Sequence, residues 1–268
     1  MKNDEILKLA LKAAEQAGEI MSHYRYKHEI SAKSSRYDIV TTADIEAEKA
    51  IVETIKSHFP EHQILAEENH KHTQDLNGPL WVIDPIDGTV NYAHGHHHTC
   101  TSIAFLDKGI TQVGVVYCPF LNEKFTAIKG QGAYLNDQKI KTTDCTEIAN
   151  AIVATGFPYV REQVMDTILA NIRTLMENAR GIRRFGAAAL DTCWVACGRL
   201  DAFFEFSLEA WDMAAGSLIA SEAGAVVGHI SGHVPNPKMP AAIDSENYLV
   251  STKGLFDFLQ TNLRARPA

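Results

Sequence analysis

The chain has 268 residues, of which 46% are hydrophobic and 22% charged, as is ordinary for a globular enzyme with a substantial core. Its formal net charge is −8 and it has no long basic run, which argues against a dedicated nucleic-acid surface, because phosphate neutralisation needs clustered Lys and Arg. No apolar stretch approaches the ~18 residues of a membrane span, and the amphipathic N-terminus does not resemble a signal peptide. Five cysteines without metal-type spacing are typical of reduced thiols, so we expect a cytoplasmic protein that does not insert into membranes.

Hydrophobic periodicity predicts the elements of the first half of the chain. A helical period indicates two helices, at residues 4–28 and 43–58. Short apolar runs and strict alternation indicate strands at 62–66, 80–83, 100–107, 111–118, 123–129 and within 130–136. The polar residues 70–79 are typical of a mobile loop. The closely spaced strands after residue 99 predict an antiparallel meander.

The organisation changes near residue 150. Strands are predicted at 151–154, 181–185, 202–206, 225–227 and 248–251. Helices are predicted at 160–178, 186–197, 210–223 and 254–264. Because strands and helices alternate here, we expect a layered α/β half. The fold class is therefore α+β, with an antiparallel-sheet half at 1–145, an α/β half at 146–268 and a site between them.

The stretch LWVIDPIDGT, residues 80–89, carries the sharpest chemical signal. Its apolar run is typical of a buried strand that ends on Asp84, and Pro85 keeps the preceding residue extended. An Asp-Gly pair that begins at Asp87 then indicates a sharp turn. The segment should direct two carboxylates at one point, with the Thr89 hydroxyl just beyond, and two hard oxygen donors suit Mg²⁺. Taken alone, an ordinary strand exit with surface acids explains the pattern equally well.

Acids lie at strand or helix ends in further places. Glu67 and Glu68 follow an apolar strand, and adjacent carboxylates repel each other unless a cation lies there. Asp212 opens a helix, where the helix dipole alone can account for an acid, and the same explanation holds for Asp44. Carboxylates that converge from separate segments on one cleft are what a multi-magnesium phosphotransfer site needs. In such a site Thr89 could orient the attacking water, with Asp44 as its hydrogen-bond partner.

Two other patterns bear on ligand binding. Gly186 is expected to open a helix, whose bare backbone N–H groups would suit a phosphate. His96, His97 and His98 suggest an alternative, a transition-metal enzyme that binds zinc or manganese. Consecutive strand residues point to opposite faces, so these three cannot converge on one ion, and this alternative is the weaker one.

Several motifs occur together and in one order: KSSRYDIVTTAD, AEEN, WVIDPIDGTVNY, GIRRFGAAALD and EAWDMAAG. With them the chain resembles the inositol monophosphatase family of magnesium-dependent, lithium-sensitive phosphatases over nearly its whole length. The resemblance implies a layered α-β-α-β-α sandwich, as in inositol monophosphatases and fructose bisphosphatases, paired as a homodimer. It also implies two to three bound Mg²⁺ ions, for which Mn²⁺ can substitute.

The resemblance implies roles for particular residues. The metal ligands would be Glu67, Asp84, Asp87, Asp212 and the backbone carbonyl of Ile86. The catalytic residues would be Thr89, Asp44 and Glu67, the first two by orienting the nucleophilic water. The substrate would contact Asp87, Gly88, Thr89, Gly186, Ala187, Ala188, Glu205 and Asp212. Lys33 would lie on a mobile loop that closes near the metals. Ala187 departs from the Thr or Ser often found in the family, which weakens the case for a polyol hydrogen bond there.

The activity implied by the resemblance is hydrolysis of a small phosphate monoester by direct attack of a metal-activated water. Myo-inositol 1-phosphate is the favoured substrate, because VNY after DGT resembles the inositol branch of the family. A broader sugar phosphatase acting on fructose 1,6-bisphosphate is the close alternative. An alternative of another class is a regulatory protein that binds RNA or the transcription machinery through the basic cluster Arg180, Arg183 and Arg184. We favour it less, because these arginines are also explained as a solvated or dimer-facing patch.

Overall fold

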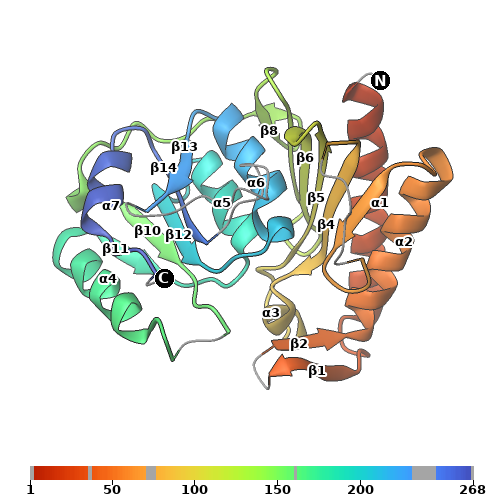
Figure 1. Cartoon of the computed structure of the whole chain (residues 1–268), viewed down its shortest axis with the longest axis horizontal. Coiled ribbons are helices and arrows are strands. Elements are labelled where there is room, and N and C mark those ends of the chain that lie inside the picture. The colour runs from red at the N-terminus through yellow and green to blue at the C-terminus, as the bar shows by residue number, and fades with distance from the viewer. Residues whose placement is uncertain (1–2, 36–37, 71–76, 160–161, 231–245, 267–268) are drawn as a thin grey trace.

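Two large β-sheets face each other across a central pair of helices in the computed structural model of the chain (Figure 1). The structure describes residues 3–35, 38–70, 77–159, 162–230 and 246–266. In order, the layers are α1 with α2, the first sheet, α5 with α6, the second sheet, and α4 with α7. These helices are α1 (Asn3–Tyr24), α2 (Thr42–His58), α4 (Met165–Asn178), α5 (Ala188–Ala196), α6 (Ala210–Glu222) and α7 (Phe256–Asn262). The layer order confirms the expected α+β sandwich.

The first sheet contains the predicted meander. Its described strands are β3 (Gln63–Ala66), β4 (Leu80–Asp87), β5 (Cys100–Asp107), β6 (Ile110–Cys118), β7 (Glu123–Ile128), β8 (Ala133–Leu135) and β9 (Gln138–Lys139), in that order across the sheet. All neighbours are antiparallel except β3 and β4, which are parallel. Strand β4 continues past the expected end at Asp84, because a bulge between Asp84 and Asp87 absorbs Pro85.

The second sheet is mixed. Its described strands run β11-β10-β12-β14-β13, with bounds β10 (Ile152–Thr155), β11 (Gly181–Arg183), β12 (Ala202–Phe206), β13 (Val226–His229) and β14 (Asn247–Ser251). Strand β10 is parallel to β11 and β12, whereas β14 is antiparallel to β12 and β13. The expected division of the chain, after residue 145, lies between the last strand of the first sheet and the first strand of the second sheet in chain order. The division into two halves stays a prediction.

Alternation along the strands separates three apolar layers. On β4, Trp81 packs against α1 and α2, and Val82 points to the central core with α5 and α6. On β12, Phe203 faces the same central core, and Phe204 faces the outer core with α4 and α7. The two central helices are buried nearly all round, as expected for helices between two sheets.

Several predicted boundaries were wrong, and backbone conformation explains one of them. The helix expected from Gly186 begins only at Ala188, because Gly186 adopts a left-handed φ of 88°. The helices expected at 4–28 and 160–178 end at Tyr24 and begin at Met165. The segment before α2, where a loop carrying Lys33 was expected, contains an antiparallel hairpin of β1 (Ile30–Ser35) and β2 (Asp38–Thr41).

Two expectations concern the remaining segments. The mobile loop predicted at 70–79 lies mostly outside the described residues, which end at 70 and resume at 77. Within the described residues, no helix has the length and apolar character needed to cross a membrane.

Candidate active site

The end of β4 brings three aspartates together. Asp84 and Asp87 come from this strand and Asp212 from the first turn of α6, and one carboxylate oxygen of each lies within 4.8 Å of the others. Gly88, with a φ of 85°, then ends the strand and caps α3 (Thr89–Ala93). A Cβ atom on Gly88 would lie 3.1 Å from the carbonyl oxygen of Gly186, so this tight turn also packs on the segment before α5.

The three aspartates have the electrostatics of a cation site. Oδ1 of Asp84 is buried without a hydrogen-bond partner in the described part of the chain. Burial and the charge of Glu67 raise the pKa of Asp84 well above its ordinary value, and burial and the charge of Asp87 do the same for Asp212. Buried carboxylates this close are costly to ionise unless a cation neutralises them. An all-oxygen set with an unpaired oxygen fits Mg²⁺.

Asp87 also holds the start of α5. Its Oδ1 accepts the N–H of Ala188 at 3.1 Å, and its Oδ2 accepts the N–H of Ala189 at 2.8 Å. Burial, then the charge of Asp191, raises the pKa of Asp87 to about 6. The expectation of bare N–H groups for a phosphate is therefore wrong for these two, because a metal-site carboxylate already binds them.

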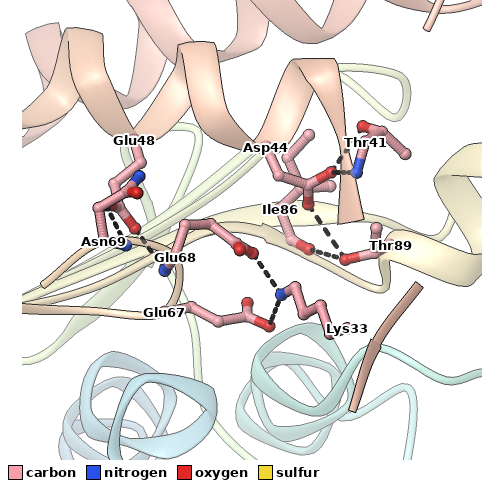
Figure 2. Close-up of polar contacts among 9 residues, drawn as sticks. All are labelled: Lys33, Thr41, Asp44, Glu48, Glu67, Glu68, Asn69, Ile86 and Thr89. Atoms are coloured by element: carbon pink, nitrogen blue, oxygen red, sulfur yellow. Dashed lines mark hydrogen bonds and ion pairs between the residues drawn. The ribbon is translucent and has the colours of Figure 1, made fainter. Parts of the chain in front are cut away.

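Thr89 and Asp44 meet as predicted. Oγ1 of Thr89 lies 3.1 Å from Oδ1 of Asp44 and 3.1 Å from the carbonyl oxygen of Ile86 (Figure 2). Oδ2 of Asp44 accepts the N–H and the hydroxyl of Thr41, so Asp44 also caps α2. Burial raises the pKa of Asp44 to about 6. Asp44 can therefore serve both purposes, because its Oδ2 caps the helix while its Oδ1 binds Thr89.

A lysine lies between the adjacent glutamates. Nζ of Lys33, on β1, donates to Oε1 of Glu67 at 2.7 Å and to Oε1 of Glu68 at 2.5 Å (Figure 2). Burial lowers the pKa of Lys33, but the charges of Glu67 and Glu68 outweigh it and raise the pKa overall. Burial, then the charge of Glu67, raises the pKa of Glu68 to about 7. Glu67 is outside the close aspartate group, although its charge acts on Asp84.

The expected substrate side is formed by the second sheet and the segment before α5. Glu205 projects from β12, and burial, then the charge of Asp191, raises its pKa to about 8. A side chain at Gly156 would collide with the Glu205 carboxylate, so this carboxylate lies directly on the Gly156 backbone. Ala187 and Ala188, at the start of α5, are buried in the central core.

Sequence reasoning missed several residues around the site. The side-chain amide of Asn91 donates to the carbonyl oxygens of His98 at 2.9 Å and Phe185 at 2.8 Å, which ties α3 to the segment before α5. Nε2 of His98 lies 2.9 Å from Oδ1 of the buried Asp191. The three histidines at residues 96–98 form a loop and not the strand assumed above. The ring of His97 stacks on that of Phe120.

Two further missed residues lie near Glu67. Glu48 of α2 accepts backbone N–H groups of the turn that follows β3. Tyr159 follows β10 with about half of its surface exposed, and the charges of Glu67 and Asp212 act on its hydroxyl. Glu48 carried a sequence signal, since it lies one helical turn after Asp44 in an apolar helix face.

Comparison with known proteins finds relatives over nearly the whole chain. Residues 2–265 match the inositol monophosphatase family. Over 229 residues the chain is 40% identical to a protein of Pasteurella multocida named Nus factor SuhB, covering 85% of this chain and 86% of that protein. The solved IMPase of Thermotoga maritima is 33% identical with a TM-score of 0.84, covering 96% of this chain and 95% of that one. A crystal structure of an IMPase/NADP phosphatase with Mg²⁺ and phosphate is 25% identical with a TM-score of 0.83, covering 96% and 94%.

The fold and the aspartate group define a layered α+β protein with a site suited to a divalent cation. The chain belongs to the inositol monophosphatase family.

Proposed function

We propose that this protein is a Mg²⁺-dependent phosphatase that hydrolyses a small phosphate monoester by direct attack of water. The observation that carries the proposal is the group of Asp84, Asp87 and Asp212, the first two of them buried, with its unpaired Asp84 oxygen, close to the Thr89–Asp44 pair. Family membership supports it, as does the Mg²⁺ and phosphate bound by a solved relative.

The proposed metal ligands are Asp84, Asp87, Asp212, Glu67 and the carbonyl of Ile86, for two to three ions. Bound Mg²⁺ would offset the acid charges, polarise the phosphate and lower the pKa of a water ligand. Lys33, already at Glu67, would supply one further positive charge there. The residues fit such ions because every donor is a hard oxygen.

The Thr89–Asp44 pair is proposed to handle the proton of the attacking water. When the Thr89 hydroxyl donates to Oδ1 of Asp44, its lone pairs remain free to accept a proton from water. That proton would pass to Thr89 as the proton of Thr89 moves to Asp44. A carboxylate whose pKa is about 6 can hold a proton briefly near neutral pH. The backbone N–H groups of Gly88 and Thr89 are proposed to contact the phosphate.

For the substrate we propose myo-inositol 1-phosphate. Glu205 and Asp212 would accept hydrogen bonds from ring hydroxyls. Gly186 and Ala187 would supply backbone contacts, and Ala188, whose N–H already donates to Asp87, would only border the substrate. A polyol suits this side of the site, because Glu205 is a half-buried carboxylate that lies directly on backbone groups. Fructose 1,6-bisphosphate is the alternative substrate. We also propose that the protein forms a homodimer, is located in the cytoplasm and is inhibited by lithium.

Phosphate release from a panel of esters tests the proposal. The panel contains inositol 1-phosphate, fructose 1,6-bisphosphate, histidinol phosphate, 3′-phosphoadenosine 5′-phosphate and NADP, each with and without Mg²⁺ and lithium. We expect Mg²⁺-dependent, lithium-inhibited release that is greatest with inositol 1-phosphate and absent in Asp84→Asn. Preference for another ester would change the substrate only. No release from any ester by folded, Mg²⁺-loaded protein would remove the enzymatic proposal.

A second candidate function is association with the transcription machinery. The Nus factor name of a 40% identical relative suggests it. Arg180, Arg183 and Arg184 also line one groove of about 450 Å³ beside α4 and β11. A pull-down from a bacterial lysate should then recover transcription proteins with wild type and Asp84→Asn alike, and lose them with Arg183→Glu. Equal recovery by Arg183→Glu would exclude this groove.

A further inference from the structure

Glu48 is a fully buried carboxylate on α2, one helical turn after Asp44. Its Oε2 accepts the N–H of Glu68 at 2.6 Å, and its Oε1 accepts the N–H of Asn69 at 2.8 Å (Figure 2). Nδ1 of His70 lies 3.0 Å from the same Oε1. All these partners belong to the turn that immediately follows Glu67.

We propose that Glu48 is a positioning residue that holds this turn so that Glu67 faces the aspartate group; the inference rests on the proposed function. Strand β3 ends at Ala66, and a backbone hydrogen bond from the N–H of Ala66 to the carbonyl oxygen of His70, at 2.9 Å, closes the turn. The N–H of Glu67 reaches the carbonyl of Ile83 only at 3.3 Å. The two bonds to Glu48 are shorter and charge-assisted, and they are therefore the stronger constraint on the turn.

The position of Glu48 on α2 gives this constraint a second consequence. Asp44 and Glu48 project from the same face of one helix, and Asp44 holds Thr89 while Glu48 holds the Glu67 turn (Figure 2). A helix of 17 residues packed on the first sheet is rigid over one turn. It therefore fixes the distance between the water-orienting pair and the Glu67 end of the metal site.

Glu48 acts through other residues and is not itself catalytic. Its side chain is 1% exposed, and its bonds go to backbone groups and to His70, so it has no access to substrate or metal. Partners that orient metal ligands typically change metal affinity 10- to 100-fold when replaced. The effect of replacing Glu48 should therefore appear in metal binding.

The test compares Glu48→Gln with Glu53→Gln, which makes the same chemical change at an exposed position of the same helix. Glutamine keeps the volume of Glu48, but its amide NH₂ faces a backbone N–H where an acceptor stood. Mn²⁺ binding is titrated calorimetrically, and the Mg²⁺ dependence of phosphate release and thermal unfolding without metal are recorded alongside. For Glu48→Gln we expect Mn²⁺ affinity to fall about 10-fold or more, half-saturating Mg²⁺ to rise equally, and kcat at saturating Mg²⁺ to change less than about 3-fold. Glu53→Gln should match wild type.

A folded Glu48→Gln protein with wild-type Mn²⁺ affinity would overturn the proposal, even if its unfolding temperature fell, because Glu48 would then be purely structural. If Glu48→Gln does not fold, Glu48→Asp takes its place, since it keeps the charge but draws the turn toward α2. A folded Glu48→Asp with unchanged Mn²⁺ affinity would overturn the proposal as well. If wild type binds Mn²⁺ but releases no phosphate, the proposed function fails, and the Mn²⁺ comparison still decides the role of Glu48.

Discussion

The Thr89 hydroxyl lies 3.1 Å from Oδ1 of Asp44, although 45 positions separate the two residues in the chain. Asp44 is held by Thr41 at the start of α2, and Thr89 begins α3 directly after the Gly88 turn. Both partners are therefore oriented by helix ends before any ligand binds, which is the condition for a preorganised catalytic pair.

Replacing Thr89 tests that pair. Thr89→Val keeps the shape and removes the hydroxyl, so kcat should fall about 100-fold or more, with little change in Mg²⁺ affinity. Thr99→Val is the matched control, because Thr99 is fully buried and its Oγ1 has no partner among the described residues. Steady-state kinetics decide between them. An equal loss of activity in both variants would show that packing and not the hydroxyl is responsible.

Asp84→Asn should change stability in opposite directions with and without metal. Without metal, the substitution removes one of several buried like charges, so the unfolding temperature should rise by a few degrees. With Mg²⁺ at about 100 times its Kd, wild type should gain about 2.7 kcal/mol and Asp84→Asn much less. Thermal unfolding measures both, with the exposed Asp107→Asn as control. Equal Mg²⁺ stabilisation of wild type and Asp84→Asn would contradict a metal site at the end of β4.

The metal-free protein should lose stability as pH rises from about 4.5 to about 8. The pKa of Glu205 is about 8 in the fold, against an ordinary value of 4.5, so in this range the folded state keeps a proton that the unfolded state has released. The free energy of unfolding then falls with rising pH, and Asp44, with a pKa of about 6, adds to the slope between about 4 and 6. Denaturant titrations at pH 5 and pH 8 measure the slope.

In Glu205→Gln, the free energy of unfolding should fall less steeply with pH, because the folded state then holds about one proton fewer in excess of the unfolded state. Its unfolding temperature at pH 8 should rise by about 2–5 °C. The exposed Glu162→Gln is the control and should leave the slope unchanged. A slope identical in wild type and Glu205→Gln would mean that Glu205 ionises normally in the fold.

Gly156 should be intolerant of even a methyl group. A Cβ atom there collides with the Glu205 carboxylate, so Gly156→Ala should displace Glu205, destabilise the protein by about 1–3 kcal/mol and raise the substrate KM. In the Glu205→Ala background the same substitution should cost almost nothing, since the colliding group is gone. Equal costs in the two backgrounds, measured by denaturant unfolding, would show that the two residues are not in contact.

Local chemistry accounts for what the sequence predicted well. The Asp84 and Asp87 pair was predictable because strand, proline and Asp-Gly turn act within a few residues of one another. The strands of the meander followed from alternation, since each strand buries one face against a different layer. The chain order of elements indicated an antiparallel half and an α/β half, and the resemblance to inositol monophosphatases supplied the layered sandwich, which the comparisons confirm.

The sequence by itself determined which acids end which elements, because helix and strand periods and turn residues act over short distances. Only the tertiary structure decided what those acids contact. It placed Glu48 under the Glu67 turn, Asp87 on the N–H groups of α5, and Glu205 on the backbone of Gly156. Such contacts depend on how whole helices and sheets pack, and no short-range pattern encodes the register between segments that meet only in the folded chain.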